Sequence, residues 1–297
     1  MNPRHLEYLV ALEGERHFGR AAERCHVTQP TLSAGIQALE AALGLPLVRR
    51  GRRYEGLTPE GERVLRWARR IVADQRDLAD DVARLRGEGG GVLRVGAIPT
   101  TLPAVSRVAS RLLREHPGLR VELRSATSRE LERDLDGFAL DLAATYLDAE
   151  VAHGRRAWAL YAERYRLVAS GTDAAALAGR DAVRWDELGG LRLCLLTPEM
   201  QNRRIIDRAL EDAGVAPEVA LETDSLSALL AHVQDGWSSI VADRWTPLLT
   251  PPADARVLPI VAPELRSPVG LVALDRDPPV PMVAAFAAAA GATPLGG

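Results

Sequence analysis

Apolar residues in the first part of the chain recur at helical spacing and predict three helices before residue 45. The first covers residues 4–13, and a short second helix covers residues 19–26 with small alanines facing inward. The third begins after Thr28, whose side chain can cap it, and ends at Gly44. Its apolar stripe consists of Leu32, Ile36, Leu39 and Leu43. Two short helices joined by a tight turn are typical of a helix-turn-helix unit.

Polar residues cluster at the start of the third predicted helix, where a DNA-reading helix would meet base edges. Gln29, Thr31 and Ser33 lie on its polar side. Amide and hydroxyl groups match the donors and acceptors that base pairs present in the major groove. The same residues would suit an ordinary helical hairpin, in which they act as caps and solvated surface. The helical pattern alone leaves both interpretations open.

Four arginines that follow the helix pair favour the DNA-binding interpretation. The cluster consists of Arg49, Arg50, Arg52 and Arg53, arranged around Gly51. A tight basic hairpin at this place is typical of the wing of a winged helix-turn-helix domain, and its guanidinium groups would pair with backbone phosphates. A solvated run of charge is the alternative. The chain has a net charge of −3, but residues 1–90 hold 15 arginines against 13 acidic residues, so any nucleic acid should bind there.

A long helix is predicted from Thr58 and Pro59, which suit an N-cap and a first helical position. Seven positions then recur with a heptad period: Val64, Ala68, Ile71, Gln75, Leu78, Val82 and Leu85. This period favours pairing of the helix with a copy of itself, and Gln75 inside the seam would fix the register. Packing of the helix against its own domain is the alternative. Two helix-turn-helix units held by one coiled coil would read two half-sites of a pseudo-palindrome.

A glycine-rich stretch marks the point at which helical periodicity gives way to short apolar strands alternating with amphipathic helices. This alternation predicts an α/β region with mostly parallel sheets, divided into two subdomains with a cleft between them. The predicted parts are a winged helix-turn-helix domain at residues 1–58, a linker and dimerisation helix at 59–87, a hinge at 88–91, subdomain I at 92–162 and 267–297, and subdomain II at 163–266.

Hydroxyl, amide and carboxylate side chains follow the predicted strands, at the positions where α/β folds bind ligands. These candidate effector-binding residues are Pro99, Thr100, Thr101, Ser128, Thr145, Thr197, Gln201, Asp224 and Ser225. As a set facing one cleft they suit a small polar or anionic molecule. Taken singly, each Ser or Thr would equally well cap the helix that it precedes.

Other features of the sequence argue against several classes of protein. With no apolar signal segment and no apolar run long enough to span a membrane, we expect a cytoplasmic protein without membrane contact. No His/Cys pair has metal-ligand spacing, and Cys25 and Cys194 do not suggest a disulfide, although redox activity of either thiol stays open. Nucleophile-elbow, P-loop and dinucleotide motifs are lacking, so we expect no catalytic residues and no cofactor or metal. An enzyme that uses the cleft, or a solute-binding protein, is the alternative.

The first sixty residues strongly resemble the LysR-type transcriptional regulators. The resemblance is carried by the runs FGRAAE, VTQPTLS, IQALE and LGLPLVRR between residues 18 and 50, and by LTPEG at residues 57–61. The layout of the whole chain is similar too, which implies a winged helix-turn-helix, a linker helix and a two-subdomain effector domain like that of periplasmic binding proteins. It also implies double-stranded promoter DNA as a partner, a homotetramer built as a dimer of dimers, and contact with RNA polymerase if the protein is an activator.

The resemblance assigns roles to individual residues. Base-reading positions would be Gln29, Pro30, Thr31 and Ser33, next to Thr28 as a further DNA-binding residue. The wing arginine on phosphate would be Arg50, and the effector segments would contain Thr100, Ser128, Thr197 and Asp224. The chain departs from the family where Ala34 and Gly35 follow Ser33, since many members place a long polar side chain there. Base reading is therefore expected to depend more on Gln29, Thr31 and Gln37 and on the wing.

Overall fold

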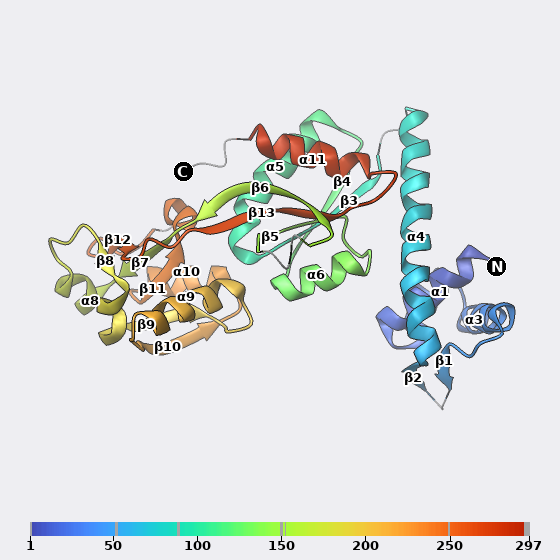
Figure 1. Ribbon diagram of the computed structural model, residues 1–297, viewed down its shortest axis with the longest axis horizontal. Helices are drawn as coiled ribbons and strands as arrows, with labels where there is room; N and C mark the ends of the chain where they lie inside the picture. The colour runs from blue at the N-terminus through green and yellow to red at the C-terminus, as the bar shows by residue number, and fades with distance from the viewer. Residues whose placement is uncertain are drawn as a thin grey trace. The chain divides into compact units, whose positions relative to one another are not determined.

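The computed structural model describes residues 2–50, 53–87, 90–148, 151, 153–248 and 250–293, with the side chains of Arg50 and Leu248 excluded. These residues form two compact units that meet in the sequence at Gly91 (Figure 1). Gly90 and Gly91 both adopt positive φ angles, 103° and 91°, a backbone conformation that residues with a Cβ rarely enter. The predicted hinge therefore contains two positions that favour glycine; Glu88 and Gly89 lie outside the described residues.

The N-terminal unit contains the three predicted helices, a two-stranded hairpin and one long helix. In chain order they are α1 (Pro3–Glu15), α2 (Phe18–Arg24), α3 (Gln29–Leu43), β1 (Val48–Arg50), β2 (Tyr54–Leu57) and α4 (Pro59–Leu85). Thr28 and Thr58 cap α3 and α4, and Gly44 ends α3 in the left-handed conformation, as predicted. The second helix ends at Arg24, two residues earlier than predicted, because His26 turns the chain with a φ of 53°.

The core of the N-terminal unit is formed by the apolar stripes of α1 and α3 together with the first turns of α4. Leu9, Leu12 and Leu32 have no exposed surface. The close packing of α3 against α1 depends on Gly35, since a Cβ there would lie 2.5 Å from Cδ2 of Tyr8. Similarly, a Cβ at Gly61 would lie 2.1 Å from the carbonyl oxygen of Leu47, so α4 begins against the wing.

The heptad seam of α4 divides into two parts. Near the start of the helix, Ala68 is fully buried, and Val64 and Ile71 pack against the core of the N-terminal unit. Towards the end of the helix, Leu78 is 64% exposed and Leu85 82% exposed. The alternative interpretation, in which α4 packs on its own domain, therefore explains the first half of the seam. The second half of the seam is exposed to solvent in a single chain.

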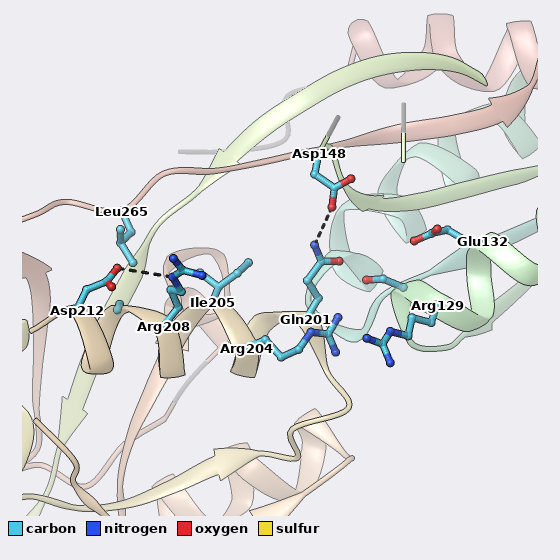
Figure 2. A pocket seen from close by; sticks show the side chains of 11 residues that line it. Arg129, Glu132, Asp148, Gln201, Arg204, Ile205, Arg208, Asp212 and Leu265 are labelled. Atoms are coloured by element: carbon cyan, nitrogen blue, oxygen red, sulfur yellow. Dashed lines mark hydrogen bonds and ion pairs between the residues drawn. The ribbon is translucent and has the colours of Figure 1, made fainter. Parts of the chain in front are cut away.

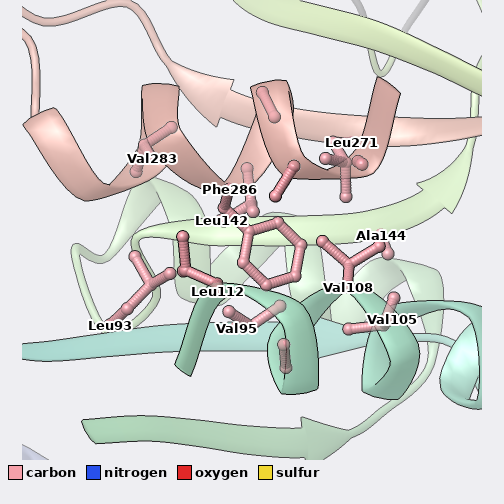
Figure 3. Close-up of a cluster of buried hydrophobic side chains, with 14 of the residues drawn as sticks. Leu93, Val95, Val105, Val108, Leu112, Leu142, Ala144, Leu271, Val283 and Phe286 are labelled. Atoms are coloured by element: carbon pink, nitrogen blue, oxygen red, sulfur yellow. The ribbon is translucent and has the colours of Figure 1, made fainter. Parts of the chain in front are cut away.

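The C-terminal unit begins with subdomain I, a five-stranded sheet in the order β4-β3-β5-β13-β6. Its elements are β3 (Val92–Ala97), η1 (Pro99–Thr101), α5 (Leu102–Glu115), β4 (Arg120–Ser125), α6 (Ser128–Asp136), β5 (Leu142–Tyr146), β6 (Arg155–Glu163), β13 (Ser267–Leu274) and α11 (Pro281–Gly291). Helices α5 and α11 cover one face of the sheet and α6 covers the other (Figure 1). Figure 3 shows the first face, where Phe286 of α11 packs against Leu112 and Val108 of α5 over strand residues such as Leu142.

Subdomain II is a six-stranded sheet in the order β10-β9-β11-β7-β12-β8. Its elements are β7 (Tyr165–Ala169), α8 (Gly171–Ala176), β8 (Val183–Arg184), η2 (Trp185–Gly190), β9 (Arg192–Leu196), α9 (Gln201–Asp212), β10 (Glu218–Thr223), α10 (Leu226–Gln234), β11 (Ser238–Ala242), η3 (Asp243–Leu248) and β12 (Arg256–Val261). Alternate residues of β9 face different cores: Leu193 and Leu195 meet α9, while Cys194 and Leu196 meet α10.

Both sheets are mixed, so the prediction of mostly parallel sheets holds only in part: five of the nine strand pairs described in these two sheets are parallel. In subdomain I, β3 pairs in parallel with β4 and β5, but β13 is antiparallel to β5 and β6. In subdomain II, β7 is antiparallel to β11 and β12. The antiparallel pairs involve β6, β7, β12 and β13, the strands that carry the chain from one subdomain to the other and back.

Candidate functional site

The exposed face of α3 carries most of the predicted base-reading residues. Gln29, Pro30, Thr31 and Gln37 are exposed and Ser33 is half-buried. Thr28 caps the helix by accepting the backbone N–H of Thr31, and the two threonine hydroxyl oxygens lie 2.8 Å apart. The two glutamine amides are the longest polar side chains of this set, and they lie two turns apart on one helix, a spacing that suits a groove-reading face.

The two residues at which the chain departs from the LysR pattern have different environments. Ala34 is exposed on the same face as Gln37. Gly35 is buried against Tyr8, so its position serves packing, and a longer side chain there would not reach the exposed face. Only Ala34 therefore shortens the reach of the exposed face.

The wing is an antiparallel pair in which Val48 faces Leu57 and Arg50 faces Tyr54. Arg49 and Arg53 are exposed on it. Arg52 and the side chain of Arg50 lie outside the described residues. The described arginines thus present two guanidinium groups to solvent beside the start of α4.

Side-chain hydrogen bonds that the sequence did not predict join the wing to the helices. The carboxylate of Glu40, on α3, accepts the backbone N–H groups of Leu47 and Val48 at 2.8 and 3.1 Å. The hydroxyl of Tyr54, on β2, donates to Glu13 of α1, and burial raises the pKa of this tyrosine. These bonds fix the hairpin relative to the exposed face of α3. The only sequence signal for Glu40 is an acidic residue three positions before the end of the amphipathic helix α3.

A cavity of about 540 Å³ lies between the two subdomains of the C-terminal unit, bounded by α6 and α9 (Figure 2). Its lining residues are Ser128, Arg129, Glu132, Asp148, Gln201, Arg204, Ile205, Arg208, Ala209, Asp212 and Leu265. The side-chain amide of Gln201 donates to the carboxylate of Asp148 at 3.4 Å, across the boundary between the subdomains. This volume suits a small organic or inorganic molecule.

Two of the nine predicted effector-binding residues, Ser128 and Gln201, line this cavity. Several of the others are held inside subdomain I, because the Thr101 hydroxyl donates to the carbonyl of Ile98 and the Thr145 hydroxyl donates to Ser128. Ser225 caps α10 by accepting the N–H of Ala228, which agrees with the capping alternative. The seven that do not line the cavity are the buried Pro99, Thr100, Thr101 and Thr145, the half-buried Thr197, and the exposed Asp224 and Ser225.

Each carboxylate that lines the cavity has a partner within the described residues. Asp148 accepts from Gln201 and from the backbone N–H of Val151. Glu132 lies 4.0 Å from the guanidinium of Arg155, and Asp212 lies 3.9 Å from that of Arg208. Arginines therefore balance the charges of Glu132 and Asp212, while neutral donors hold Asp148.

Two arginines of the lining have no carboxylate partner among the described residues. Arg204 donates to the carbonyl oxygens of Pro198 and Glu199, and Arg129 makes no hydrogen bond or ion pair with any described group. Arg129 extends from the first turn of α6 and Arg204 from the first turn of α9, and Figure 2 shows their guanidinium groups pointing toward one another. Two like charges near helix N-termini create a positive field in the cavity, which favours an anion.

The two cysteine thiols lie in apolar surroundings in different units. Cys194 is fully buried within β9, and Cys25 is half-buried at the end of α2. Burial raises the pKa of both thiols, which lowers their thiolate fraction at neutral pH. Among the described residues no group of three or more His, Cys, Asp or Glu side chains could hold a metal ion, and no helix of that part of the chain is long and apolar enough to cross a membrane.

Two family descriptions match the chain. Residues 3–62 match the bacterial regulatory helix-turn-helix protein, lysR family, and residues 86–293 match the LysR substrate binding domain. Among curated proteins, the chain is 31% identical over 288 residues to the DNA-binding transcriptional dual regulator OxyR of Escherichia coli (strain K12), a match that covers 92% of this chain and 89% of that protein.

Other relatives match over a shorter span. The chain is 43% identical over 140 residues to the SDS degradation transcriptional activation protein of a Pseudomonas species, which covers 47% of this chain and 46% of that protein. The match thus spans about half the length of this relative, and the same holds for the hydrogen peroxide-inducible genes activators of Dickeya chrysanthemi and Pectobacterium carotovorum.

The fold is shared with solved structures. A full-length OxyR variant from Pseudomonas aeruginosa superposes with a TM-score of 0.78 at 24% identity, covering 99% of this chain and 96% of that one. Full-length CbnR complexed with its target DNA superposes with a TM-score of 0.66 at 24% identity, covering 98% and 99%. At this level of identity the likeness establishes a common architecture for both units.

Proposed function

The chain belongs to the LysR family of DNA-binding transcriptional regulators, and we propose that it binds specific promoter sequences. We further propose that a small anion, bound in the cavity between α6 and α9, alters this DNA binding. The observation that carries the DNA-binding part is the exposed face of α3 held beside the basic wing by Glu40. A rigid reading face and a phosphate-binding hairpin are the two components that specific DNA binding needs.

The roles on DNA follow from the chemistry of the side chains. Gln29 and Gln37 read base edges with their amides, and Thr31 contributes a hydroxyl or its methyl group. Arg49 and Arg53, together with Arg50 and Arg52 of the same arginine cluster in the sequence, bind phosphates without reading sequence. Residues 1–58 then form the DNA-binding domain that the sequence predicts, and we propose a cytoplasmic location, where such a regulator meets the chromosome.

Self-association follows from the open half of the α4 seam. Leu78, Val82 and Leu85 present apolar surface at the end of a helix of 27 residues, and burying it against the same face of a second copy removes this surface from water. The paired helices would set the spacing of two reading heads on a pseudo-palindrome. We further propose a homotetramer built as a dimer of dimers, and contact with RNA polymerase if the protein activates transcription.

The effector part of the proposal depends on Arg129 and Arg204. An anion between them would join α6 of subdomain I to α9 of subdomain II by charge-assisted hydrogen bonds, which are stronger than neutral ones. Because the two arginines come from different subdomains, occupancy of the cavity changes the balance between subdomain arrangements. Sulfate, phosphate and small dicarboxylates have the required charge and size.

Thiol-based sensing is a weaker alternative, raised by relatives whose names refer to hydrogen peroxide. In this chain Cys194 is fully buried and Cys25 is half-buried, and burial raises the pKa of each thiol. Reactive sensor thiols are exposed and have lowered pKa values. The cavity arginines therefore support effector binding better than the thiols support redox sensing.

Binding of the full chain to a fluorescent duplex from the region upstream of its own coding sequence tests the proposal. We expect binding at least roughly 10³-fold tighter than to a random duplex of the same length, with affinity falling steeply as salt rises. Adding an anion that binds the cavity should change this affinity in the wild type and not in Arg204→Ala. Equal binding to both duplexes would contradict the DNA-binding part; specific binding that no tested anion changes would contradict the effector part alone.

A further inference from the structure

Glu163 is a carboxylic acid buried where the chain first crosses between the subdomains. It is the last residue of β6, is 0% exposed, and is separated from β7 only by Arg164. Its Oε1 accepts hydrogen bonds from the hydroxyl of Tyr146 and, at 3.2 Å, from the side-chain amide of Asn202. Its Oε2 is equally buried and has no hydrogen-bond partner among the residues that the structure describes. A buried carboxyl oxygen without a partner is unusual and calls for a physical reason.

The groups that face Glu163 do not include a cation bonded to it. Its charged and titratable neighbours are Tyr146 on β5, Tyr161 on β6, Tyr165 on β7, and Asp243 on η3, while Arg244 of η3 lies over the ring of Tyr161. Within the described chain no arginine or histidine forms an ion pair with Glu163, and the nearby Arg164 is paired with Asp243 and Glu264. An ionised Glu163 would therefore be a buried charge that two hydrogen bonds stabilise but no cation neutralises, which is costly.

The partners of Glu163 belong to both subdomains. Tyr146 ends β5 in subdomain I, and Asn202 lies in the first turn of α9 in subdomain II, between Gln201 and the arginines that follow it. Asn202 also donates to the hydroxyl oxygen of Tyr146 at 3.3 Å. This buried triad therefore fixes the end of α9 that supplies Gln201 and Arg204 to the cavity.

A tryptophan contact marks the same boundary. The indole N–H of Trp245, on η3 of subdomain II, donates to the backbone carbonyl of Thr100 in subdomain I at 3.0 Å. The hydroxyl of Thr100 is itself buried beside Glu163 and does not reach hydrogen-bond geometry with any described group. Trp245 is thus a reporter whose environment depends on whether the two subdomains stay joined at this point.

We propose that Glu163 is a positioning residue that joins the subdomains when its carboxyl is protonated and loosens their contact when it ionises. In the neutral state the triad with Tyr146 and Asn202 is intact and the first turn of α9 is held at the cavity. In the ionised state the cost of burying a charge without a cation exceeds the stabilisation from the two donated hydrogen bonds, so the carboxylate draws in water, which separates Asn202 from subdomain I. The inference concerns how the cavity is held and is independent of which effector fills it.

The electrostatics place this change near neutral pH. Burial is the main cause that raises the pKa of Glu163, to about 7, and the hydrogen bonds from Tyr146 and Asn202 oppose the rise because they stabilise the carboxylate. The neutral, joined state is therefore favoured below about pH 7 and the ionised, loosened state above it. Removing the Tyr146 hydroxyl should raise the pKa of Glu163 further, a shift that a purely structural role would not produce.

Tryptophan emission of the full-length protein, recorded from about pH 5 to about pH 9, tests the proposal. We expect the wild-type emission to shift to longer wavelength with a midpoint near pH 7. The shift should be lost in Trp245→Phe, which removes the reporter, and in Glu163→Gln, which mimics the neutral carboxyl. In Tyr146→Phe the midpoint should move to higher pH.

Glu211→Gln is the matched control, because Glu211 is an exposed glutamate on α9, and it should keep the wild-type midpoint. An unchanged midpoint in Glu163→Gln would overturn the proposal, since another group would then be titrating. A wild-type emission maximum that stays constant over the whole pH range would overturn it equally. A downward movement of the midpoint in Tyr146→Phe would show that the hydroxyl does not stabilise the carboxylate and would contradict the mechanism.

Discussion

Gly35 lies directly beneath the ring of Tyr8, so that a Cβ at position 35 would stand 2.5 Å from Cδ2 and 2.7 Å from Cε2 of that ring. This close approach lets α3 pack against α1 while its opposite face stays exposed. The DNA-reading geometry that we propose therefore depends on a residue that contacts no DNA.

Gly35→Ala should consequently destabilise the N-terminal unit by roughly 1–3 kcal/mol through overpacking. The affinity for DNA should fall by about the same factor for every sequence, because the exposed face of α3 is displaced while its side chains are unchanged. Denaturant unfolding followed by circular dichroism measures the stability. Gly190→Ala is the matched control, since a Cβ there meets no atom within 4 Å, and it should leave stability unchanged. Equal stability of Gly35→Ala and wild type would contradict the packing argument.

Substitutions along α4 should separate folding from self-association. Leu78→Asp places a charge on the exposed half of the seam, so we expect a folded protein that sediments as a smaller species than wild type. Ile71→Asp changes a residue that packs against the core of its own unit, so it should also lower the unfolding midpoint. Sedimentation velocity gives the oligomeric state. Leu45→Asp, at another exposed leucine, should keep the wild-type state; an unchanged assembly in Leu78→Asp would refute the proposed seam.

The three arginines of the cavity should differ in their effect on anion binding. Arg129→Ala and Arg204→Ala should each weaken binding of an anion by about 10-fold to 100-fold, since each removes a charge-assisted hydrogen bond. Arg208→Ala should have a smaller effect because Arg208 already lies 3.9 Å from the carboxylate of Asp212. Calorimetric titration of the full chain with sulfate, phosphate and small dicarboxylates measures the affinities. Equal losses in all three variants would indicate a general surface-charge effect and not a specific site.

Glu163 should also make stability depend on pH. Because the folded protein holds this carboxyl with a pKa of about 7, against 4.5 as its ordinary value, the folded state binds more protons between these values. Stability should therefore fall as pH rises from 4.5 towards 7 and stay low above it, with a total loss of about 3 kcal/mol. Glu163→Gln should remove this loss, so that its unfolding midpoint in denaturant exceeds that of wild type at pH 8 and not at pH 4. A wild-type curve that rises through this window would exclude the assignment.

Local features of the fold were predictable from the sequence because local chemistry determines them. The caps at Thr28 and Thr58 and the left-handed end at Gly44 each follow from one side chain or its absence. The direction of the strands was not predictable in the same way. Pairing between β13 and β5 joins residues more than a hundred positions apart, and the crossing of the chain between subdomains decides their antiparallel orientation.

The effector residues show a second limit of the sequence. Hydroxyl residues at strand ends are expected at a cleft, yet Thr101 and Thr145 form their hydrogen bonds within subdomain I. The sequence gives no sign of this, because only the folded chain shows which way each hydroxyl turns. Arg129 and Glu163 were missed for the opposite reason, because a charged residue is ordinarily solvated surface. Only the tertiary structure shows that Arg129 has no partner among the described residues and that Glu163 is fully buried.

The central claim is that this chain reads DNA sequence with the exposed face of α3. Selection of bound duplexes from a random library, with the full-length wild type and Gln29→Ala compared side by side, tests it most directly. We predict that the wild type enriches a pseudo-palindromic site and that Gln29→Ala loses roughly 1–3 kcal/mol of discrimination at particular base pairs of each half-site. Arg53→Ala should weaken binding to all duplexes about equally and flatten the salt dependence. No enriched site with the wild type, or an identical site with Gln29→Ala, would contradict the account.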